Sequence, residues 1–483
     1  MTKELPTGWI TARLNEIAEI NPRHPKGLDD SMQVSFVPMA AISESSSEFK
    51  MSEVRLLGKV RKGFTHFGEG DVLFAKITPC MENGKGAVAR GLRNQLGCGT
   101  TELHVIRPIL GISSDYIYRF LAQNCVRQAA KDNFTGTAGQ ARVPTEFIQE
   151  LEISLAPIFE QQRIVAKLEK LLSRVESSQK RMAKIPVLLK RFRKSLLAAA
   201  FSGRLTADWR EENPGLEQAS KLLCRIADIL SGQNAKPKKI DDGDINLLSL
   251  TKDEIPESWC VTRLGCCFAE FKNGTTATQN SEGRGHPVTR IETVQNFRFD
   301  LNRVRHIEHI SVDELATFRY QYGDIAFSHI NSYEHVGKTA LYTGVPLTLV
   351  HGMNLLRLRL GHELLHPRFV HLFMQSDFFR SEVRSRVGHA VNQVSINQKS
   401  LAQVPIVIVP LLEQQEIVRR VEILFALIDK IEVRYKTAQS QVDKLTQSIL
   451  AKAFRGELVP QDPNDEPVEQ LLKRIVKAKT GKK

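Results

Sequence analysis

The sequence predicts an α+β protein in which two similar α/β units alternate with two long coiled-coil helices, as an internal tandem duplication. Three observations predict this fold class. The phrase SLLAAAFSGRL at 195–205 returns as SILAKAFRGEL at 448–458, with seven of eleven positions identical. Apolar residues keep a 3.5-residue period through the segments that end in these phrases. The stretches before them hold short apolar runs bounded by glycine turns, which is typical of strands.

The duplication reaches far beyond the repeated phrase. An offset of 253 residues (448 − 195) aligns further motifs, and the two chain starts, around Trp9 and Trp259, align at an offset of 250. A three-residue insertion in the second copy explains the difference. A register held over this length indicates duplication rather than chance. The aligned motifs are Glu160-Gln161-Gln162 with Glu413-Gln414-Gln415, Gly70-Asp71 with Gly323-Asp324, Gly84-Lys85 with Gly337-Lys338, and Gln140 with Gln393.

The repeat divides the chain into six parts. Composition shifts and glycine-rich or proline-rich stretches mark the borders. LLKRI at 471–475 echoes LLCRI at 222–226, so a short helical phrase follows each long helix. The predicted parts are a first domain at 1–156, a central coiled-coil helix at 157–205, a linker with a short helix at 206–255, a second domain at 256–409, a second coiled-coil helix at 410–458 and a C-terminal tail at 459–483.

The two long helices carry the strongest local pattern. Their apolar positions repeat every 3.5 residues over five heptads, which predicts a coiled-coil seam, and the simplest partner for each helix is the other. Pro186 predicts a kink in the first helix because proline removes a backbone donor. Gly203 and Gly456 follow the last apolar turns and are expected to end the helices. The predicted seam residues are Ile164, Leu168, Leu171, Val175, Met182, Ile185, Leu189, Phe192 and Leu196 in the first helix, and Ile417, Val421, Leu424, Ile428, Ile431, Tyr435, Val442, Leu445 and Ile449 in the second.

The two domains are predicted to mix strands and helices. VLFAKI at 72–77 and IAFSHI at 325–330 are apolar runs that follow a Gly-Asp turn. LEISLAP at 151–157 and VPIVIVP at 404–410 are predicted as closing strands that lead into the long helices. Residues 115–131 have apolar residues at helical spacing.

Charge and composition narrow the class of protein. The chain has a net charge of +13, and nine of these charges lie on residues 157–205, while both domains are nearly neutral. The basic helix could lie near nucleic-acid phosphates, face an acidic partner or simply be solvated. Seven scattered cysteines without a CxxC pair argue against disulfides and a structural zinc site. No secretory signal and no apolar run of about 20 residues is visible, so we expect a cytoplasmic protein without membrane spans.

No motif predicts an active site or a bound metal ion. Gly337-Lys338-Thr339 resembles the end of a phosphate-binding loop, but Ser332 stands where that motif needs glycine, so a turn is predicted. Asp30 with Glu48-Phe49-Lys50 could imitate a nuclease carboxylate set, yet the second copy lacks it. The histidines show no metal-ligand spacing. A self-contained nuclease or methyltransferase remains one alternative, and a solitary coiled-coil interaction protein remains another.

The helical phrases resemble one protein family over nearly the whole chain. EQQRIVAKLEKLLSRV, IPVLLKRFRKSLLAAAFSGRL, EQQEIVRRVEILFALID and LTQSILAKAFRGEL look like the DNA-specificity subunit of type I restriction–modification enzymes, and are most similar to the enterobacterial-type members. The resemblance implies two target-recognition domains related by pseudo-two-fold symmetry. It also implies antiparallel packing of the long helices, whereas the sequence by itself allows a parallel pair.

The resemblance implies partners and cofactors as well. The subunit would be a non-catalytic part of a restriction–modification complex and would bind double-stranded DNA, reading a bipartite asymmetric site with one half-site per domain. Two modification subunits would bring S-adenosylmethionine, and two restriction/translocation subunits would use ATP and magnesium, with no cofactor in this subunit. A specificity subunit that serves only a methyltransferase is the alternative within this class.

Polar residues in aligned turns are the candidates for DNA contacts. Asparagine and glutamine pair with adenine and arginine with guanine, which favours these residue types. Gln140 and Gln393 could equally brace a loop, because the pair persists where specificity should differ. The candidates are Lys76, Lys85, Gln140 and Arg142 in the first copy, and His329, Asn331, Lys338, Asn392, Gln393 and Asn397 in the second.

Overall fold

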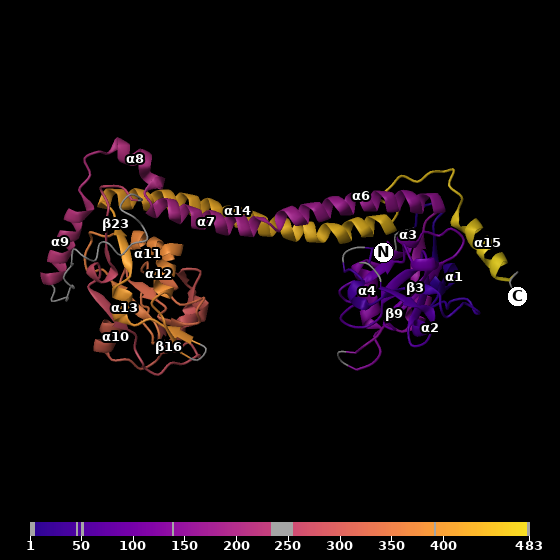
Figure 1. The fold of residues 1–483 in the computed structure, drawn as a ribbon, viewed down its shortest axis with the longest axis horizontal. Coiled ribbons are helices and arrows are strands. Elements are labelled where there is room, and N and C mark those ends of the chain that lie inside the picture. Colours follow the sequence, from indigo (N-terminus) through magenta and orange to yellow (C-terminus); the bar gives the residue numbers. More distant parts are fainter. Residues whose placement is uncertain are drawn as a thin grey trace. The chain divides into compact units, whose positions relative to one another are not determined.

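The structure is a computed structural model of the whole chain. It describes residues 5–44, 47–49, 53–137, 140–232, 255–390 and 393–480. Two compact units can be distinguished: the first comprises Met1–Ala183 with Tyr435–Lys483, and the second comprises Lys184–Arg434. Each unit therefore combines one domain with part of each long helix (Figure 1).

The first unit holds two four-stranded sheets and a closing strand pair. The sheet orders are β2-β9-β6-β7 and β4-β3-β8-β5, and β1 pairs with β10. The strands are β1 (Ile10–Arg13), β2 (Ala18–Ile20), β3 (Gln33–Val37), β4 (Glu53–Leu56), β5 (Thr65–Gly68), β6 (Val72–Ala75), β7 (Gly86–Val88), β8 (Leu96–Gly99), β9 (Leu103–Pro108) and β10 (Glu152–Leu155). The helices are α1 (Leu14–Ile17), α2 (Leu57–Val60), α3 (Ser114–Leu121), α4 (Asn124–Asp132), α5 (Thr145–Glu150), α6 (Ile158–Met182) and α15 (Val468–Thr480).

The second unit repeats this plan with a more divided sheet region. Its sheets are β12-β20-β17-β19, β18-β22-β21 and the pairs β11-β23, β13-β16 and β14-β15. The strands are β11 (Cys260–Arg263), β12 (Glu270–Asn273), β13 (His286–Val288), β14 (Val294–Gln295), β15 (Arg298–Phe299), β16 (Arg305–Ile307), β17 (Ile325–Phe327), β18 (Ile330–Asn331), β19 (Thr339–Leu341), β20 (Leu356–Arg359), β21 (Gly388–Ala390), β22 (Gln393–Ser395) and β23 (Pro405–Ile408). The helices are α7 (Ile185–Phe201), α8 (Ala207–Glu212), α9 (Ala219–Gly232), α10 (Val312–Phe318), α11 (Pro367–Gln375), α12 (Asp377–Arg384) and α13 (Gln398–Ala402).

The predicted strands occur where the sequence places them. The closing strands are β10 and β23, each paired antiparallel with the strand that opens its domain. The helix predicted over 115–131 is instead two helices, α3 and α4. The chain turns at Gln123, which lies before the first residue of α4 with extended backbone angles. The apolar spacing continues across this break, so the pattern could not reveal it.

The second long helix, α14 (Leu411–Phe454), contributes residues to both units. In the first unit its last part lies beside α6: Gln179, near the end of α6, donates to Asp443 of α14, and Arg163, near the start of α6, pairs with Asp465, which follows the end of α14. In the second unit its first part lies beside α7: Arg193 of α7 pairs with Asp429, and Arg210 of α8, which follows α7 in the chain, pairs with Glu413 near the start of α14. The antiparallel pairing is therefore confirmed within each unit (Figure 1).

The predicted seam is buried over part of its length. Phe192, Ile431 and Leu445 differ from the prediction, because 46%, 37% and 45% of their surface is exposed. The first helix is interrupted where Pro186 predicts a kink: α6 ends at Met182, and α7 begins at Ile185 with the proline in its first turn. Buried seam residues are Ile164, Leu168, Val175, Leu189, Leu196, Ile417, Val421 and Ile428, and half-buried ones are Leu171, Met182, Ile185, Leu424, Tyr435, Val442 and Ile449.

The repeated phrase packs each helix end against the domain of the other copy. Phe201, at the end of α7, lies 5.5 Å from Phe369 and 5.2 Å from Phe373 between ring centroids. Its counterpart Phe454, at the end of α14, lies 4.9 Å from Tyr116 and 5.4 Å from Phe120. All six positions correspond at the offset of 253, so the same aromatic cluster forms twice, once in each unit.

The glycines that end these helices belong to the same junction. Gly203 and Gly456 have φ of +77° and +72°, which confirms the predicted left-handed helix ends. A side chain would not fit at either position, because a Cβ at Gly203 would overlap Pro256 and one at Gly456 would overlap Pro6. The end of each long helix thus touches the start of the other copy's domain.

Short helices complete each unit after this junction. Val468, at the start of α15, donates its backbone N–H to the carbonyl of Gly8 at 3.0 Å, and Ala219, at the start of α9, donates to Ser258 at 2.9 Å. The apolar faces of α15 and α9 are buried in the two main cores. The predicted tail at 459–483 and linker at 206–255 therefore contain helices that form part of the domains. Residues 233–254 and 481–483 lie outside the described residues.

A tryptophan–glutamate hydrogen bond links each domain to its own long helix. The indole N–H of Trp9 donates to Glu160 at 2.9 Å, and that of Trp259 donates to Glu413 at 2.8 Å. Burial raises the pKa of the Glu160 carboxyl. The next residues act as braces too: Gln161 and Gln414 each donate to a backbone carbonyl five residues earlier, at 2.8 Å. These contacts explain why the Glu-Gln motif is present in both copies.

Replacing Gly456 with alanine should destabilise the first unit. The substitution adds a Cβ against Pro6 and places a side chain at positive φ, so we expect the free energy of unfolding to fall by about 1–3 kcal/mol. Urea denaturation measures the loss. Gly91→Ala is the control, since Gly91 also has positive φ but has no atom within 4 Å of the added Cβ. Equal losses in the two variants would contradict a packed junction.

Candidate nucleic-acid interface

A short segment, which we call the recognition arm, pairs in each unit with the residues that follow one strand. That strand is β6 in the first unit and β17 in the second. The arm comprises residues 133–143 in the first unit and 386–396 in the second, described except for 138–139 and 391–392. In the first unit the backbone of Arg142 forms β-bridges with both Ile77 and Thr135. In the second, Ser395 pairs with both Ile330 and Gly388. Each of these positions matches its counterpart at the offset of 253.

The backbone hydrogen bonds of the two arms match as well. The N–H of Val143 donates to the carbonyl of Lys76 at 2.9 Å, and the N–H of Ile396 donates to that of His329 at 2.9 Å. Both arms therefore have the same backbone frame although their side chains differ. A shared frame with different side chains is what two related recognition surfaces require.

A glycine–lysine turn flanks each arm. Gly84 and Gly337 have φ of +80° and +79°, so the predicted turn is confirmed in both copies. The ammonium group of Lys85 donates to the carbonyl of Met39 at 3.2 Å. The pKa of Lys338 is lowered by burial and then by the positive charge of Arg380. Positive groups thus gather around the second turn, and they would favour a bound anion.

Basic residues on one face of a helix border the same turns. Arg127 and Lys131 on α4 correspond to Arg380 and Arg384 on α12 at the offset of 253, and the spacing of four places each pair on one helix face. Lys131 forms an ion pair, at 2.6 Å, with Glu82, which lies beside the Gly84-Lys85 turn of the first unit. Arg380 and Arg384 donate to the carbonyl of Glu334 at 3.0 and 3.4 Å in the second turn.

Sequence reasoning missed these helix residues. Burial lowers the pKa of both Arg127 and Arg380, and the neighbouring Arg384 contributes to the shift at Arg380. The guanidinium of Arg384 also lies over the ring of Tyr333, at 5.7 Å. The sequence did hold a signal for them, because both copies have a basic residue at each of the two aligned positions. The prediction considered only residues in turns.

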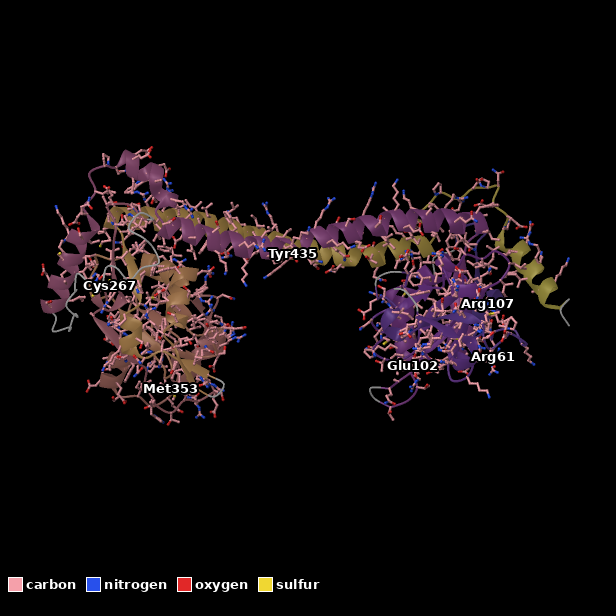
Figure 2. All side chains as sticks on the ribbon, in the orientation of Figure 1. Arg61, Glu102, Arg107, Cys267, Met353 and Tyr435 are labelled. Carbon is pink, nitrogen blue, oxygen red and sulfur yellow. The ribbon has the colours of Figure 1, made fainter. Side chains whose placement is uncertain are left out.

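The predicted first-copy residues lie close together but have different roles. Arg142 forms a two-point ion pair with Glu102, at 2.9 Å through each nitrogen, so its guanidinium braces the arm; Glu102 is labelled in Figure 2. Lys76 is half-buried, and its backbone N–H donates to the carbonyl of Glu102 at 3.0 Å. Gln140 is exposed, and its carbonyl accepts from Arg142. Gln140 is therefore the first-copy candidate whose side chain is best placed to meet a base.

The predicted second-copy residues also gather at the arm and its turn. His329 is half-buried, and burial lowers its pKa. Asn331 donates its amide to Ser328 at 3.1 Å, and the side chain of Asn397 accepts from the N–H of Ser400 at 2.8 Å, so both brace turns. Gln393 is exposed at the start of β22. Asn392 lies outside the described residues.

The residues that could imitate a nuclease carboxylate set do not form a described site. Asp30 pairs with Arg61 at 2.9 Å, and Lys50 lies outside the described residues.

The two arms, turns and basic helix faces offer hydrogen-bonding side chains and positive charge. This chemistry is typical of binding to nucleic acid, and its duplication defines a protein with two recognition domains.

Comparison with known proteins identifies the family. The profile of the type I restriction modification DNA specificity domain matches residues 6–187 and again residues 256–438. The chain belongs to this family, and the double match confirms the duplication. The resemblance stated from the helical phrases is therefore confirmed, and family members of this kind are non-catalytic DNA-specificity subunits of type I restriction–modification systems.

Relatives cover most of the chain. The EcoEI specificity subunit of Escherichia coli is 27% identical over 92% of this chain and 83% of its own length. The EcoKI specificity subunit of Escherichia coli (strain K12) is 32% identical over 75% of this chain and 69% of its own. The HsdS subunit from Thermoanaerobacter tengcongensis has a similar fold, with a TM-score of 0.61 and 20% identity over 94% of this chain and 99% of that one. A chain solved in work on assembly of the type I R-M system gives a TM-score of 0.65, also at 20% identity and the same coverage.

As a specificity subunit, the chain acts with DNA and with other restriction–modification subunits. Within the part of the chain that is described, none of the helices has the length and apolar character needed to cross a membrane.

Removing Arg380 and Arg384 together, by alanine substitution, should weaken DNA binding similarly for all sequences. Arginines that neutralise phosphates release counterions, so we expect the slope of log K against log salt to fall by about 1 for each phosphate that the double variant no longer neutralises. Fluorescence anisotropy at several salt concentrations measures both quantities. Arg225→Ala on α9 is the control, because Arg225 is an exposed arginine of the same unit that pairs with Glu217. An unchanged slope would exclude α12 from the interface.

Proposed function

We propose that this subunit reads an asymmetric, bipartite DNA site, with one half-site bound by each recognition domain. The observation that carries the proposal is the shared arm frame: Arg142 in the first unit and Ser395 in the second occupy the same bridging position. Equal frames would dock equally on the DNA backbone, and unequal side chains would read unequal bases. The two half-sites should therefore differ in sequence.

The glutamine that both arms share is the best candidate for reading a base common to the two half-sites, and the arm residues that differ would read the bases that distinguish them. Gln140 and Gln393 are exposed at matched positions, and a glutamine amide can donate to and accept from the major-groove edge of adenine. Arg142 is less suited to this role because Glu102 already holds its guanidinium. The lysines at the turns, Lys85 and Lys338, are suited to phosphate contacts, and so are the arginines Arg127 on α4 and Arg380 and Arg384 on α12.

The long helices offer matched surfaces to partner subunits. Phe159 and Leu412 correspond at the offset of 253 and are 63% and 60% exposed. Phe192 and Leu445 also correspond and are about equally exposed. Exposed apolar side chains that recur in both copies favour docking of two identical partners, one on each copy. This supports two modification subunits per specificity subunit.

The other subunits would supply the chemistry. In this proposal the modification subunits bring S-adenosylmethionine, two restriction/translocation subunits use ATP and magnesium, and this chain binds no cofactor of its own for the reaction. The alternative, a subunit that serves a methyltransferase alone, is less well supported, because the matching relatives carry the names of restriction-enzyme subunits.

Domain replacement tests the assignment of half-sites. Residues 1–156 are exchanged for the equivalent domain of a relative with a different target, and methylated adenines are mapped in host DNA. We expect one half of the methylated site to change while the other half stays the same. Exchange of 256–409 is the matched control and should change the opposite half. A change of both halves by either exchange would contradict one half-site per domain.

Phe192→Ser and Leu445→Ser test the docking surfaces. Each substitution removes one exposed apolar side chain, so each should weaken the binding of one modification subunit, and the double variant should weaken both. Native mass spectrometry of the co-expressed complex counts the subunits. Val312→Ser is the control, since Val312 is 82% exposed on α10 and has a lysine as its counterpart in the first copy, Lys59 at the offset of 253 or Lys62 at that of 250. If the double variant still bound two modification subunits, Phe192 and Leu445 would not be part of the docking surface.

A further inference from the structure

Two histidines and a cysteine meet in the first unit. One ring nitrogen of His24, one of His66 and the Sγ of Cys98 all lie within 4.8 Å of one another. His66 on β5 and Cys98 on β8 are directly opposite in the antiparallel pair, so their side chains share one face of the sheet. His24 comes from the segment after β2, and its ring stacks on that of His66, with centroids 4.4 Å apart.

The hydrogen bonds of His24 and His66 fix which ring nitrogen of each carries the lone pair. The Nε2 of His24 lies 3.1 Å from the carbonyl of Phe67, and the Nε2 of His66 lies 2.9 Å from that of Arg61. A carbonyl oxygen only accepts, so each neutral ring carries its proton on Nε2 and its lone pair on Nδ1. Metal-binding histidines commonly have this arrangement, in which a backbone carbonyl fixes the tautomer.

Neither Nδ1 lone pair accepts a short hydrogen bond from the described residues. The Nδ1 of His24 is buried and has no hydrogen-bond partner among the described residues. The Nδ1 of His66 has a long contact of 3.5 Å with the backbone nitrogen of His24. A buried acceptor without a partner costs free energy, which a bound cation would recover.

The charge states also suit a metal ion. Burial lowers the pKa of His24, so this ring is neutral near pH 7 and its lone pair is available. Burial raises the pKa of the Cys98 thiol to about 11. A divalent cation reverses this effect because it stabilises the thiolate directly. Without a cation, Cys98 is a buried thiol that reacts only when the first unit opens locally.

We propose that His24, His66 and Cys98 bind one divalent cation of the zinc type. Two imidazole nitrogens and one thiolate form a donor set that suits zinc, and the two half-buried histidines leave a fourth position open to water or another ligand. The ion would tie the segment that carries His24 to the sheet β4-β3-β8-β5. The proposal concerns the stability of the first unit and does not depend on how DNA is read.

The second copy serves as an internal comparison. At the offset of 253, His66 corresponds to Arg319 and Cys98 to His351, and Arg319 pairs with the neighbouring Val350. Arginine cannot take the place of the His66 ligand, so the site belongs to the first copy and one ion is expected per chain. The sequence could not reveal the site, because its three ligands come from separate elements without a recognisable spacing.

Zinc binding to the full chain tests the proposal. The purified protein is stripped with a chelator, titrated with zinc chloride against a competing chelator, and analysed for metal content. We expect one zinc ion per chain, an affinity that falls as histidines protonate at lower pH, and at least about tenfold weaker binding in Cys98→Ser and in His24→Gln. Cobalt should give a thiolate charge-transfer band that Cys98→Ser lacks. Cys125→Ser and His286→Gln, which alter an exposed cysteine and a second-unit histidine, should bind as the unaltered chain does.

A second measurement avoids any folding defect of the variants. In the unaltered protein, at a urea concentration below the unfolding transition where local opening exposes Cys98, zinc should slow the alkylation of Cys98, read by peptide mass spectrometry, and leave the alkylation rate of exposed Cys125 unchanged. Circular dichroism checks that the variants are folded. The proposal is overturned if the chain binds no stoichiometric zinc, if all variants bind alike, or if zinc leaves the alkylation of Cys98 unchanged.

Discussion

The aromatic junction at the end of each long helix is the contact on which the rest of the structure depends. Phe201 packs on Phe369 and Phe373 of the second domain, and Phe454 packs on Tyr116 and Phe120 of the first. The core of each domain is therefore completed by a helix that belongs to the other copy. Neither copy is a closed folding unit, which explains why the phrase that makes this contact is kept in both copies.

Glycine makes this junction possible. At Gly203 and Gly456 the chain must leave the helix with positive φ and also lie directly against a proline of the domain it meets. Both requirements exclude a side chain. The short helices α9 and α15 then pack into the two cores, so each helix end is fixed on both sides of the glycine.

Much of the fold could be predicted because it depends on periodic patterns and repetition. The long helices, the closing strands and the helix-ending glycines follow from local rules. The break between α3 and α4 could not be predicted, because the apolar spacing runs through it. The exposure of Phe192 and Leu445 escaped prediction for a related reason: an apolar residue at a seam position can equally face a partner, and only the packing shows which.

The site was predicted in outline and missed in detail. Turn residues such as Gln140 and Gln393 do lie on a matched frame, whereas the engagement of Arg142 by Glu102 depends on a contact between residues 40 positions apart. The basic faces of α4 and α12 were missed although both copies carry them. The set of His24, His66 and Cys98 depends on the register of β5 against β8, which no local pattern encodes.

A constant backbone frame with variable side chains accounts for how one chain can treat two different half-sites in the same way. The frame, the braces and the helix ends are repeated, whereas the residues of the arms differ between the copies at every position except Gln140 and Gln393. Site-specific photo-crosslinking tests this account most directly. A crosslinking residue placed at Gln140 or at Gln393, in the chain bound to its target DNA, should react with one half-site only, and with opposite halves in the two cases. Crosslinks from both positions to the same half-site, or to neither, would contradict the account.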